Sequence, residues 1–211
     1  FAVFTEGIGA QEAEKDSITT PFRKGRWLAS LAGSIGSSAT ENTTSEVKLI
    51  SNYYRIEISA GKFVIDRLNI GLNVNLERES FHIEIDEERT SEDLFIGPKI
   101  AYFVSKSEIG SLYFSLTPGF IMYRDETEKG QNENFIDNVN KGNGFGLFST
   151  FGYVYAIKDR VAFDLGLNWS SYWIDINQES IGVQKVNSVN FVLSDFTFSF
   201  GFKILLDSKL D

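Results

Sequence analysis

The chain has 211 residues, of which 42% are hydrophobic, 14% aromatic and 23% charged, with a formal net charge of −9. This length fits one domain, and the aromatic content excludes a disordered chain. The absence of cysteine excludes disulfides and thiolate metal sites, the single histidine excludes multi-histidine zinc centres, and the acidic balance argues against nucleic acid as a partner.

Residues 1–21 are predicted to be a signal-peptide remnant and a flexible N-terminus. Residues 1–4 are apolar, and the sequence Ile8-Gly9-Ala10 ends in small residues before a polar stretch, as at a signal-peptide cleavage site. An ordinary flexible N-terminus is the alternative interpretation. No later apolar run approaches the roughly 18 residues that a transmembrane helix requires, so any membrane insertion must occur through strands.

Alternation with a period of two dominates the rest of the chain and predicts β-strands. In residues 68–76 every even position is aliphatic and every odd position is Asn or Gly, and residues 161–169 repeat this scheme. Six further segments are predicted to be strands with a less regular phase: residues 25–37, 52–65, 94–105, 111–124, 144–157 and 189–206. We expect bulges at Pro98 and Pro118, because proline removes a ladder hydrogen bond, and at Leu193–Ser194, where the phase changes.

The connections between these strands alternate in length. The short ones are residues 66–67, 106–110 and 158–160, and the long polar ones are residues 38–51, 77–93, 125–143 and 175–188. Short turns at one end and long loops at the other are typical of outer-membrane barrels. The pattern therefore predicts an all-β fold, an eight-stranded antiparallel up-and-down transmembrane β-barrel over residues 22–206, followed by a tail at residues 207–211.

The apolar face of the predicted strands is rich in aromatic residues, and Tyr and Trp concentrate towards the strand ends, as in the girdles at membrane interfaces. These aromatic residues are Trp27, Tyr54, Tyr102, Phe114, Phe120, Phe145, Phe151, Tyr153, Tyr155, Phe163, Trp169, Trp173, Phe196, Phe198, Phe200 and Phe202. The opposite face carries glycines, which fit the cramped interior of an eight-stranded barrel. We therefore expect the apolar face to point outwards to lipid. A soluble ligand-binding barrel would have the inverse arrangement.

Charged residues within the strands fall on the small and polar face. They are Arg55, Glu57, Lys99, Asp164 and Lys203. Because a basic residue at the centre of the lipid face costs roughly 2–4 kcal/mol, these side chains should lie inside the barrel and pair with opposite charges. Asp164 and Lys203 are predicted to be in contact, and the other three to form a second group. The same face offers Phe63, Phe95, Phe103, Tyr113, Phe148 and Tyr172, so we expect a packed polar core and not an open pore.

These features resemble the small eight-stranded outer-membrane β-barrels of Gram-negative bacteria, of the OmpA/OmpX type among the porin-family outer-membrane proteins. Family members end in a signal that the barrel-assembly machinery reads, and Ser199, Gly201, Ile204 and Leu206 match its pattern. Leu206 replaces the usual terminal aromatic residue, and the tail continues beyond it. The resemblance implies a monomer in the bacterial outer membrane, with its lipid, lipopolysaccharide and the assembly machinery as partners.

Few residues carry candidate chemistry. Ser80, His82 and Glu84 share one face, but residues two apart on a strand are separated by roughly 6.5 Å, too far for a base to contact its nucleophile. The acidic runs of the predicted loops lack the spacing of a Ca²⁺-binding EF-hand loop, so we interpret them as solvated surface charge. We therefore predict no catalytic, cofactor-binding or metal site and a structural or surface-interaction role. The alternatives are an outer-membrane lipid-modifying enzyme and a soluble periplasmic ligand-binding barrel.

Overall fold

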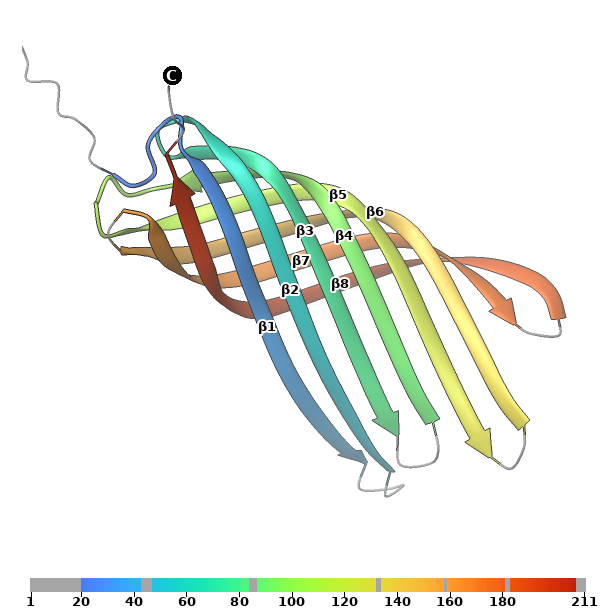
Figure 1. The fold of residues 1–211 in the computed structure, drawn as a ribbon. Coiled ribbons are helices and arrows are strands. Elements are labelled where there is room, and N and C mark those ends of the chain that lie inside the picture. Colours follow the sequence, from blue (N-terminus) through green and yellow to red (C-terminus); the bar gives the residue numbers. More distant parts are fainter. Residues whose placement is uncertain are drawn as a thin grey trace, which may run out of the picture.

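In the computed structural model, eight antiparallel strands close into a barrel in which each strand pairs with its sequence neighbours and β8 returns to β1 (Figure 1). The strands are β1 (Trp27–Asn42), β2 (Val47–Ile65), β3 (Leu68–Ile83), β4 (Glu87–Phe103), β5 (Gly110–Gln131), β6 (Asn134–Ile157), β7 (Val161–Ser180) and β8 (Val183–Leu206). The predicted fold class is confirmed.

The structure describes residues 20–42, 47–83, 87–131, 134–157, 159–180 and 183–207. Within these ranges no helix is long and apolar enough to cross a membrane. The predicted signal-peptide cleavage site at residues 8–10 lies outside the described residues, as does the tail beyond Asp207.

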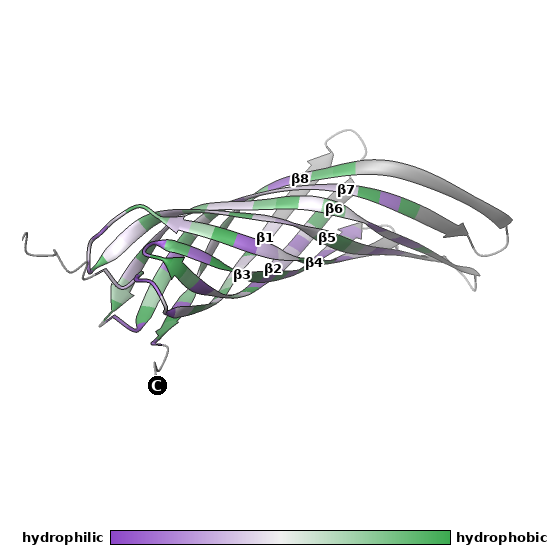
Figure 2. Ribbon diagram, turned by 90° about the horizontal axis from the view of Figure 1, so that it is seen from above, coloured by the Kyte–Doolittle hydropathy of each residue, from purple (hydrophilic) through white to green (hydrophobic). Residues whose placement is uncertain are grey.

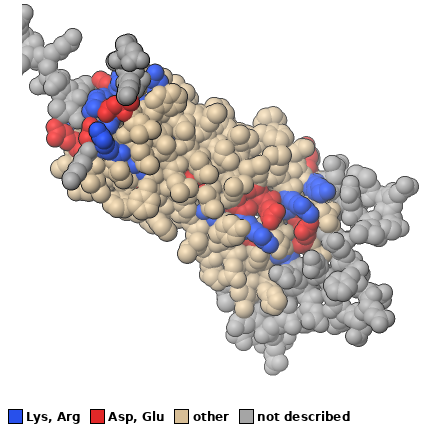
Figure 3. Space-filling view, viewed as in Figure 1, with Lys and Arg blue, Asp and Glu red and all other residues tan. Residues whose placement is uncertain are grey.

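The alternating sequence pattern separates the two faces of the barrel wall, as the hydropathy colours of Figure 2 show along the strands. All sixteen aromatic residues expected on the outer face are exposed, from 38% for Phe120 to 71% for Phe145. The six aromatic residues expected inside are at most 4% exposed. On the face drawn in Figure 3, the charged residues gather in two groups, and a broad uncharged band lies between them. The apolar side chains therefore point outwards.

The expectation of four long polar loops at residues 38–51, 77–93, 125–143 and 175–188 is wrong, because the strands extend through most of these segments. β1 pairs with β2 as far as Asn42 and Val47, and β5 pairs with β6 as far as Gln131 and Asn134. The physical reason is that a hairpin ladder is held by backbone hydrogen bonds and needs no apolar face. Loss of the apolar alternation marks where both faces become polar, and not where the strand ends.

The predicted bulges are also wrong. Ladder pairs between β4 and β5 stop after Ile96↔Phe120 and resume at Ile100↔Leu116 in the same register, so Pro98 and Pro118 face each other across a single gap in the ladder. Two residues without an amide hydrogen thus share one interruption and no residue is inserted.

β8 likewise keeps its register through Leu193 and Ser194, which pair with Tyr172 and Ser171. Leu193 packs against the buried aromatic cluster of the interior, which explains an apolar residue on the inner face. The register shifts lie elsewhere, at Phe63–Ile65 and Gln178–Ser180.

The short-turn end contains both ends of the described chain, because Trp27 at the start of β1 pairs with Leu206 at the end of β8. Arg67 and Asp159 adopt positive φ angles of 69° and 59° in their tight turns. At this end Lys62, which shares the outer face, lies with its Nζ 5.9 Å from the centroid of the Trp27 ring.

The seam between β1 and β8 is the shortest ladder in the barrel. Its pairs run only from Trp27↔Leu206 to Gly33↔Phe200. Beyond Gly33 the β7–β8 hairpin diverges from the β1–β2 hairpin, as Figure 1 shows. The barrel is therefore closed by hydrogen bonds only over the half that lies towards the short turns.

Candidate functional site: the barrel interior and its vestibule

The segment before β1 fills the short-turn end of the interior. Phe22 is fully buried, and its ring centroid lies 4.3 Å from that of Phe103 in a stacked arrangement and 6.1 Å from that of Phe63. The backbone N–H of Arg67 donates to the Phe22 carbonyl at 2.7 Å, and that of Gly25 donates to the Phe63 carbonyl at 2.8 Å. This segment is therefore fastened to the barrel and forms an apolar plug.

A buried arginine ties the same segment to neighbouring parts of the short-turn end. The side chain of Arg26 is 2% exposed, and its Nη1 donates to Asp159 Oδ1 at 2.7 Å. Its Nη2 donates to the Asp159 carbonyl at 2.6 Å, and its Nε lies 2.9 Å from Asp207 Oδ1. Arg23 adds contacts to both carboxylates, at 3.1 Å and 3.0 Å. These contacts of Arg23 and Arg26 with Asp159 and Asp207 form a clasp, which joins the chain before β1 to the β6–β7 turn and to the end of β8.

Above the plug the structure brings Asp164 and Lys203 together. Their side chains are 5% and 3% exposed, and Lys203 Nζ contacts Asp164 Oδ2. Tyr113 completes the group, since its hydroxyl donates to Asp164 Oδ2 at 3.1 Å and accepts from Lys203 Nζ at 3.4 Å. Asp164 on β7 pairs with Gly201 on β8, so its carboxylate lies diagonally across from Lys203. The two side chains therefore lie at a similar depth in the barrel, as the sequence predicts.

A second ion pair crosses the interior between β2 and β4. Lys99 Nζ donates to Glu57 Oε1 at 2.7 Å and to Ser59 Oγ at 3.3 Å, and the two charged side chains are 9% and 7% exposed. Together the two pairs place two cations and two carboxylates in the middle of the interior, so these four formal charges cancel.

Arg55 belongs to a different group from the one expected. Its Nε donates to Glu77 Oε2 at 2.7 Å, its Nη1 to Thr197 Oγ1 at 2.6 Å and its Nη2 to Asp195 Oδ2 at 3.1 Å. The guanidinium carbon lies 5.8 Å from the centroid of the Phe148 ring. Arg55 therefore links β2 and β3 to β8, across the seam where β1 and β8 have ceased to pair.

The sequence had grouped Arg55 with Glu57 and Lys99, and the partners Glu77 and Asp195 were not singled out. Glu77 fell at the start of an expected loop, although its odd number continues the inward row of Asn73 and Asn75 on the same strand. Extending the alternation by one residue would have found it.

An aromatic layer separates the central ion pairs from the long-hairpin end. Its residues are Phe95, Ile121, Tyr123, Phe148, Tyr172 and Ile174. Beyond it a vestibule of about 530 Å³ opens towards the hairpins. Its ionisable lining consists of Glu77, Glu79, Asp93, Asp195, Arg55 and Arg89, together with Tyr53, Tyr123 and Tyr172. Acidic side chains thus outnumber basic ones around this opening.

Arg89 lies near the start of β4, in the β3–β4 hairpin beyond the apolar band of the outer face, and it forms an ion pair with Asp125. Its Nε donates to Asp125 Oδ1 at 2.7 Å, and this hydrogen bond raises the pKa of the Arg89 guanidinium. The described residues contain no group of three or more His, Asp and Glu side chains suited to a metal ion.

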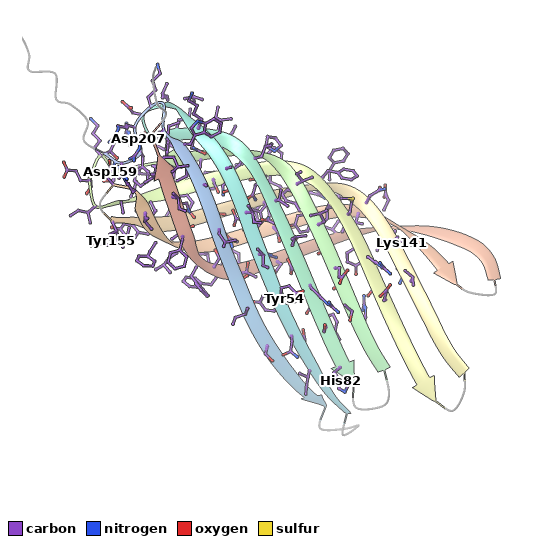
Figure 4. The ribbon with its side chains drawn as sticks, in the orientation of Figure 1. Tyr54, His82, Lys141, Tyr155, Asp159 and Asp207 are labelled. Atoms are coloured by element: carbon purple, nitrogen blue, oxygen red, sulfur yellow. The ribbon has the colours of Figure 1, made fainter. Side chains whose placement is uncertain are left out.

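His82 lies on the outer face of β3 towards the hairpin end, where Figure 4 labels it, and it is exposed. No hydrogen bond joins it to Ser80 in the part of the chain that the structure describes, and Glu84 lies outside the described residues. The geometry therefore offers no assembled Ser–His pair.

Comparison with known proteins rests on the structure alone. No protein-family model matches the chain, and no curated protein sequence matches it. Among solved structures, the outer membrane protein OprG from Pseudomonas aeruginosa matches with a TM-score of 0.55 and 10% identity, over 90% of this chain and 100% of that one. A major outer membrane protein from Thermus thermophilus matches with a TM-score of 0.55 and 9% identity, over 86% of this chain and 99% of that one.

The neisserial surface protein NspA matches at 18% identity with a TM-score of 0.47, over 86% of this chain and 97% of that one. At these identities the first two likenesses establish the fold only. The fold is that of small outer-membrane β-barrels, with eight antiparallel strands in a closed ring.

Proposed function

We propose that the chain is an integral β-barrel of the Gram-negative outer membrane with a structural or surface-interaction role. The observation that carries the proposal is the outer face: aliphatic and aromatic side chains from all eight strands are exposed around the barrel. Soluble monomers rarely expose contiguous apolar patches larger than a few hundred Å², whereas a lipid-facing barrel requires such a belt.

The side-chain orientation argues against a soluble periplasmic ligand-binding barrel, which would bury its apolar face around a ligand. Cell fractionation tests this point. The folded chain should remain with the outer membrane until detergent is added, and its mobility in a semi-native gel should shift on heating. Recovery as a soluble monomer from the periplasm would overturn the proposal.

We further propose that the interior is packed and does not conduct ions. The apolar plug, the central ion pairs and the aromatic layer succeed one another along the interior, and their side chains are buried. An eight-stranded barrel is narrow enough for side chains to fill it. Planar-bilayer recordings of the purified protein should give no steady ohmic conductance. A large, stable conductance would indicate a water-filled channel.

The extended hairpins are proposed to face the extracellular side and both strand termini the periplasm. Protease added to intact cells should cut within residues 125–143 and spare the turn at Asp66 and Arg67. Cleavage only after the membrane is permeabilised would reverse this topology. In this orientation the acidic hairpins would contact any extracellular partner. This agrees with the general tendency of binding residues to lie on exposed connections of a rigid scaffold.

A non-enzymatic monomer is the remaining part of the proposal. The only histidine is exposed and has no assembled partner among the described residues, so His82→Ala should not abolish any activity on lipid substrates. Loss of such an activity would favour a lipid-modifying enzyme.

The end of β8 is proposed to be the signal for the barrel-assembly machinery. Ser199 and Gly201 are buried on the inner face, and Ile204 and Leu206 are exposed on the outer face. This arrangement would offer the machinery one apolar face of the strand. Leu206→Ser should reduce the amount of folded barrel in cells.

A further inference from the structure

The outer wall carries one row of polar and charged residues at the edge of the apolar belt nearest the long hairpins. Cross-strand pairing places side by side, on strands β2 to β6, the exposed residues Tyr54, Arg78, Glu92, Arg124 and Lys141. Figure 4 labels Tyr54 and Lys141, which mark the two ends of this row. The neighbouring outward row, two residues nearer the short turns, is Ile56, Leu76, Leu94, Met122 and Asn143.

The two rows together line a groove of about 620 Å³ on the outer surface. Ile56, Leu76, Leu94 and Met122 form its apolar floor, and the charged row forms its rim towards the hairpins. The remaining lining residues are Glu77, Asp93, Tyr123, Gly142 and Asn143. Because residues two apart on a strand are separated by roughly 6.5 Å, the apolar floor and the charged rim lie within the span of one lipid headgroup and the start of its acyl chain.

The cations of this rim are weakly engaged or unengaged. Arg78 Nη1 lies 3.6 Å from Glu92 Oε1, and these side chains are 46% and 51% exposed. Arg124 contacts Glu126 and is 53% exposed. Lys141 has no ion pair within the described ranges. Exposed pairs of this kind contribute little, so a ligand with a stronger negative charge can take their place. The outward row of the groove thus holds three cations and one carboxylate, Glu92. The other two lining carboxylates, Glu77 and Asp93, come from the inward rows, and Glu77 is paired with Arg55 inside the barrel.

We propose that this groove binds a phosphorylated glycolipid of the outer leaflet. A lipid phosphate lies against Arg78, Arg124 and Lys141, which supply charge-assisted hydrogen bonds, and an acyl chain lies along the floor from Leu76 to Met122. Tyr54 provides an aromatic ring at the interface, where such rings are favoured. The inference rests on the proposed orientation, with the long hairpins outside the cell. The groove selects a lipid rather than free phosphate because half of its lining is apolar.

Binding is tested with the full chain, refolded in a maltoside detergent. The probe is a diphosphorylated, acylated glucosamine disaccharide lipid, titrated and followed by native mass spectrometry, with the dephosphorylated lipid as the comparison. The variant Arg78→Gln/Arg124→Gln/Lys141→Gln removes the rim cations and leaves the interior untouched. Lys62→Gln is the matched control, because it removes an outward cation from the opposite end of the belt.

The wild-type chain and Lys62→Gln should bind the diphosphorylated lipid at least about tenfold more tightly than the triple variant, since each cation near a lipid phosphate contributes to affinity. The dephosphorylated lipid should bind all three proteins equally weakly. Equal binding of the phosphorylated lipid by the wild type and the triple variant would overturn the assignment, as would displacement of that lipid by inorganic phosphate alone. The heat-dependent gel shift is recorded for every protein, so that loss of this site is distinguished from failure of the membrane-barrel proposal.

Discussion

Breaking the Asp164–Lys203 pair should destabilise the barrel strongly. In Asp164→Asn the shape is kept but Lys203, 3% exposed, loses its charged partner. Removing one member of a buried pair costs about 3–5 kcal/mol, because the other charge is left unpaired. The lower end applies here, since the Tyr113 hydroxyl still accepts from Lys203 Nζ at 3.4 Å. With a urea dependence of about 2–3 kcal/mol per molar, the unfolding midpoint should fall by at least about 1 M.

The assay is urea unfolding in lipid vesicles, followed by tryptophan emission. Trp27, Trp169 and Trp173 are 48%, 41% and 52% exposed on the outer face, so their environment changes from lipid to water when the barrel opens. Asp175→Asn is the control, because Asp175 is an exposed carboxylate with no ion pair among the described residues.

The double variant Asp164→Asn/Lys203→Met separates loss of charge pairing from loss of packing. Replacing both members of a buried pair by neutral groups is often close to neutral, so most of the lost stability should return. The reasoning is refuted if Asp164→Asn unfolds at the wild-type midpoint, or if the double variant is no more stable than the single one.

Three further outcomes follow from the interior and the wall. Phe22→Ala removes the ring stacked on Phe103 and should lower the free energy of unfolding by about 3–5 kcal/mol, measured by the same urea titration. Arg26→Ala leaves two carboxylates without their buried partner and should lower the urea midpoint, whereas unchanged stability would show that the clasp contributes nothing. A Cβ added at Gly71 would lie 2.0 Å from the carbonyl oxygen of Ala60 on the adjacent strand β2, whereas a Cβ added at Gly33 would lie 3.2 Å from its nearest atom. Gly71→Val should therefore abolish the heat-dependent gel shift and Gly33→Ala should keep it; a folded Gly71→Val barrel would contradict the close approach of β2 and β3.

The sequence by itself determined the number of strands, their order and the face that the aromatic and charged residues within the predicted strands take. Period-two alternation is local, and in a strand it fixes orientation directly, so Phe198 and Phe63 could be assigned to outside and inside without coordinates. The contact of Asp164 with Lys203 was also predictable, because Asp164 follows closely on the short turn at residues 158–160 and Lys203 lies shortly before the end of the last strand at Leu206. Both side chains could therefore be placed at a similar depth on adjacent strands.

Only the tertiary structure decided how far the strands continue and which interior groups meet across the barrel. The polar hairpins are held by backbone hydrogen bonds, which leave no mark on side-chain composition, and so residues 125–131 were interpreted as loop although β5 contains them. Arg55 reaches Glu77 and Asp195 on strands β3 and β8, a choice that depends on the register around the closed ring. The charged row on the outer wall depends on the same register, because Arg78, Arg124 and Lys141 lie far apart in the sequence and become neighbours only when four strands are aligned.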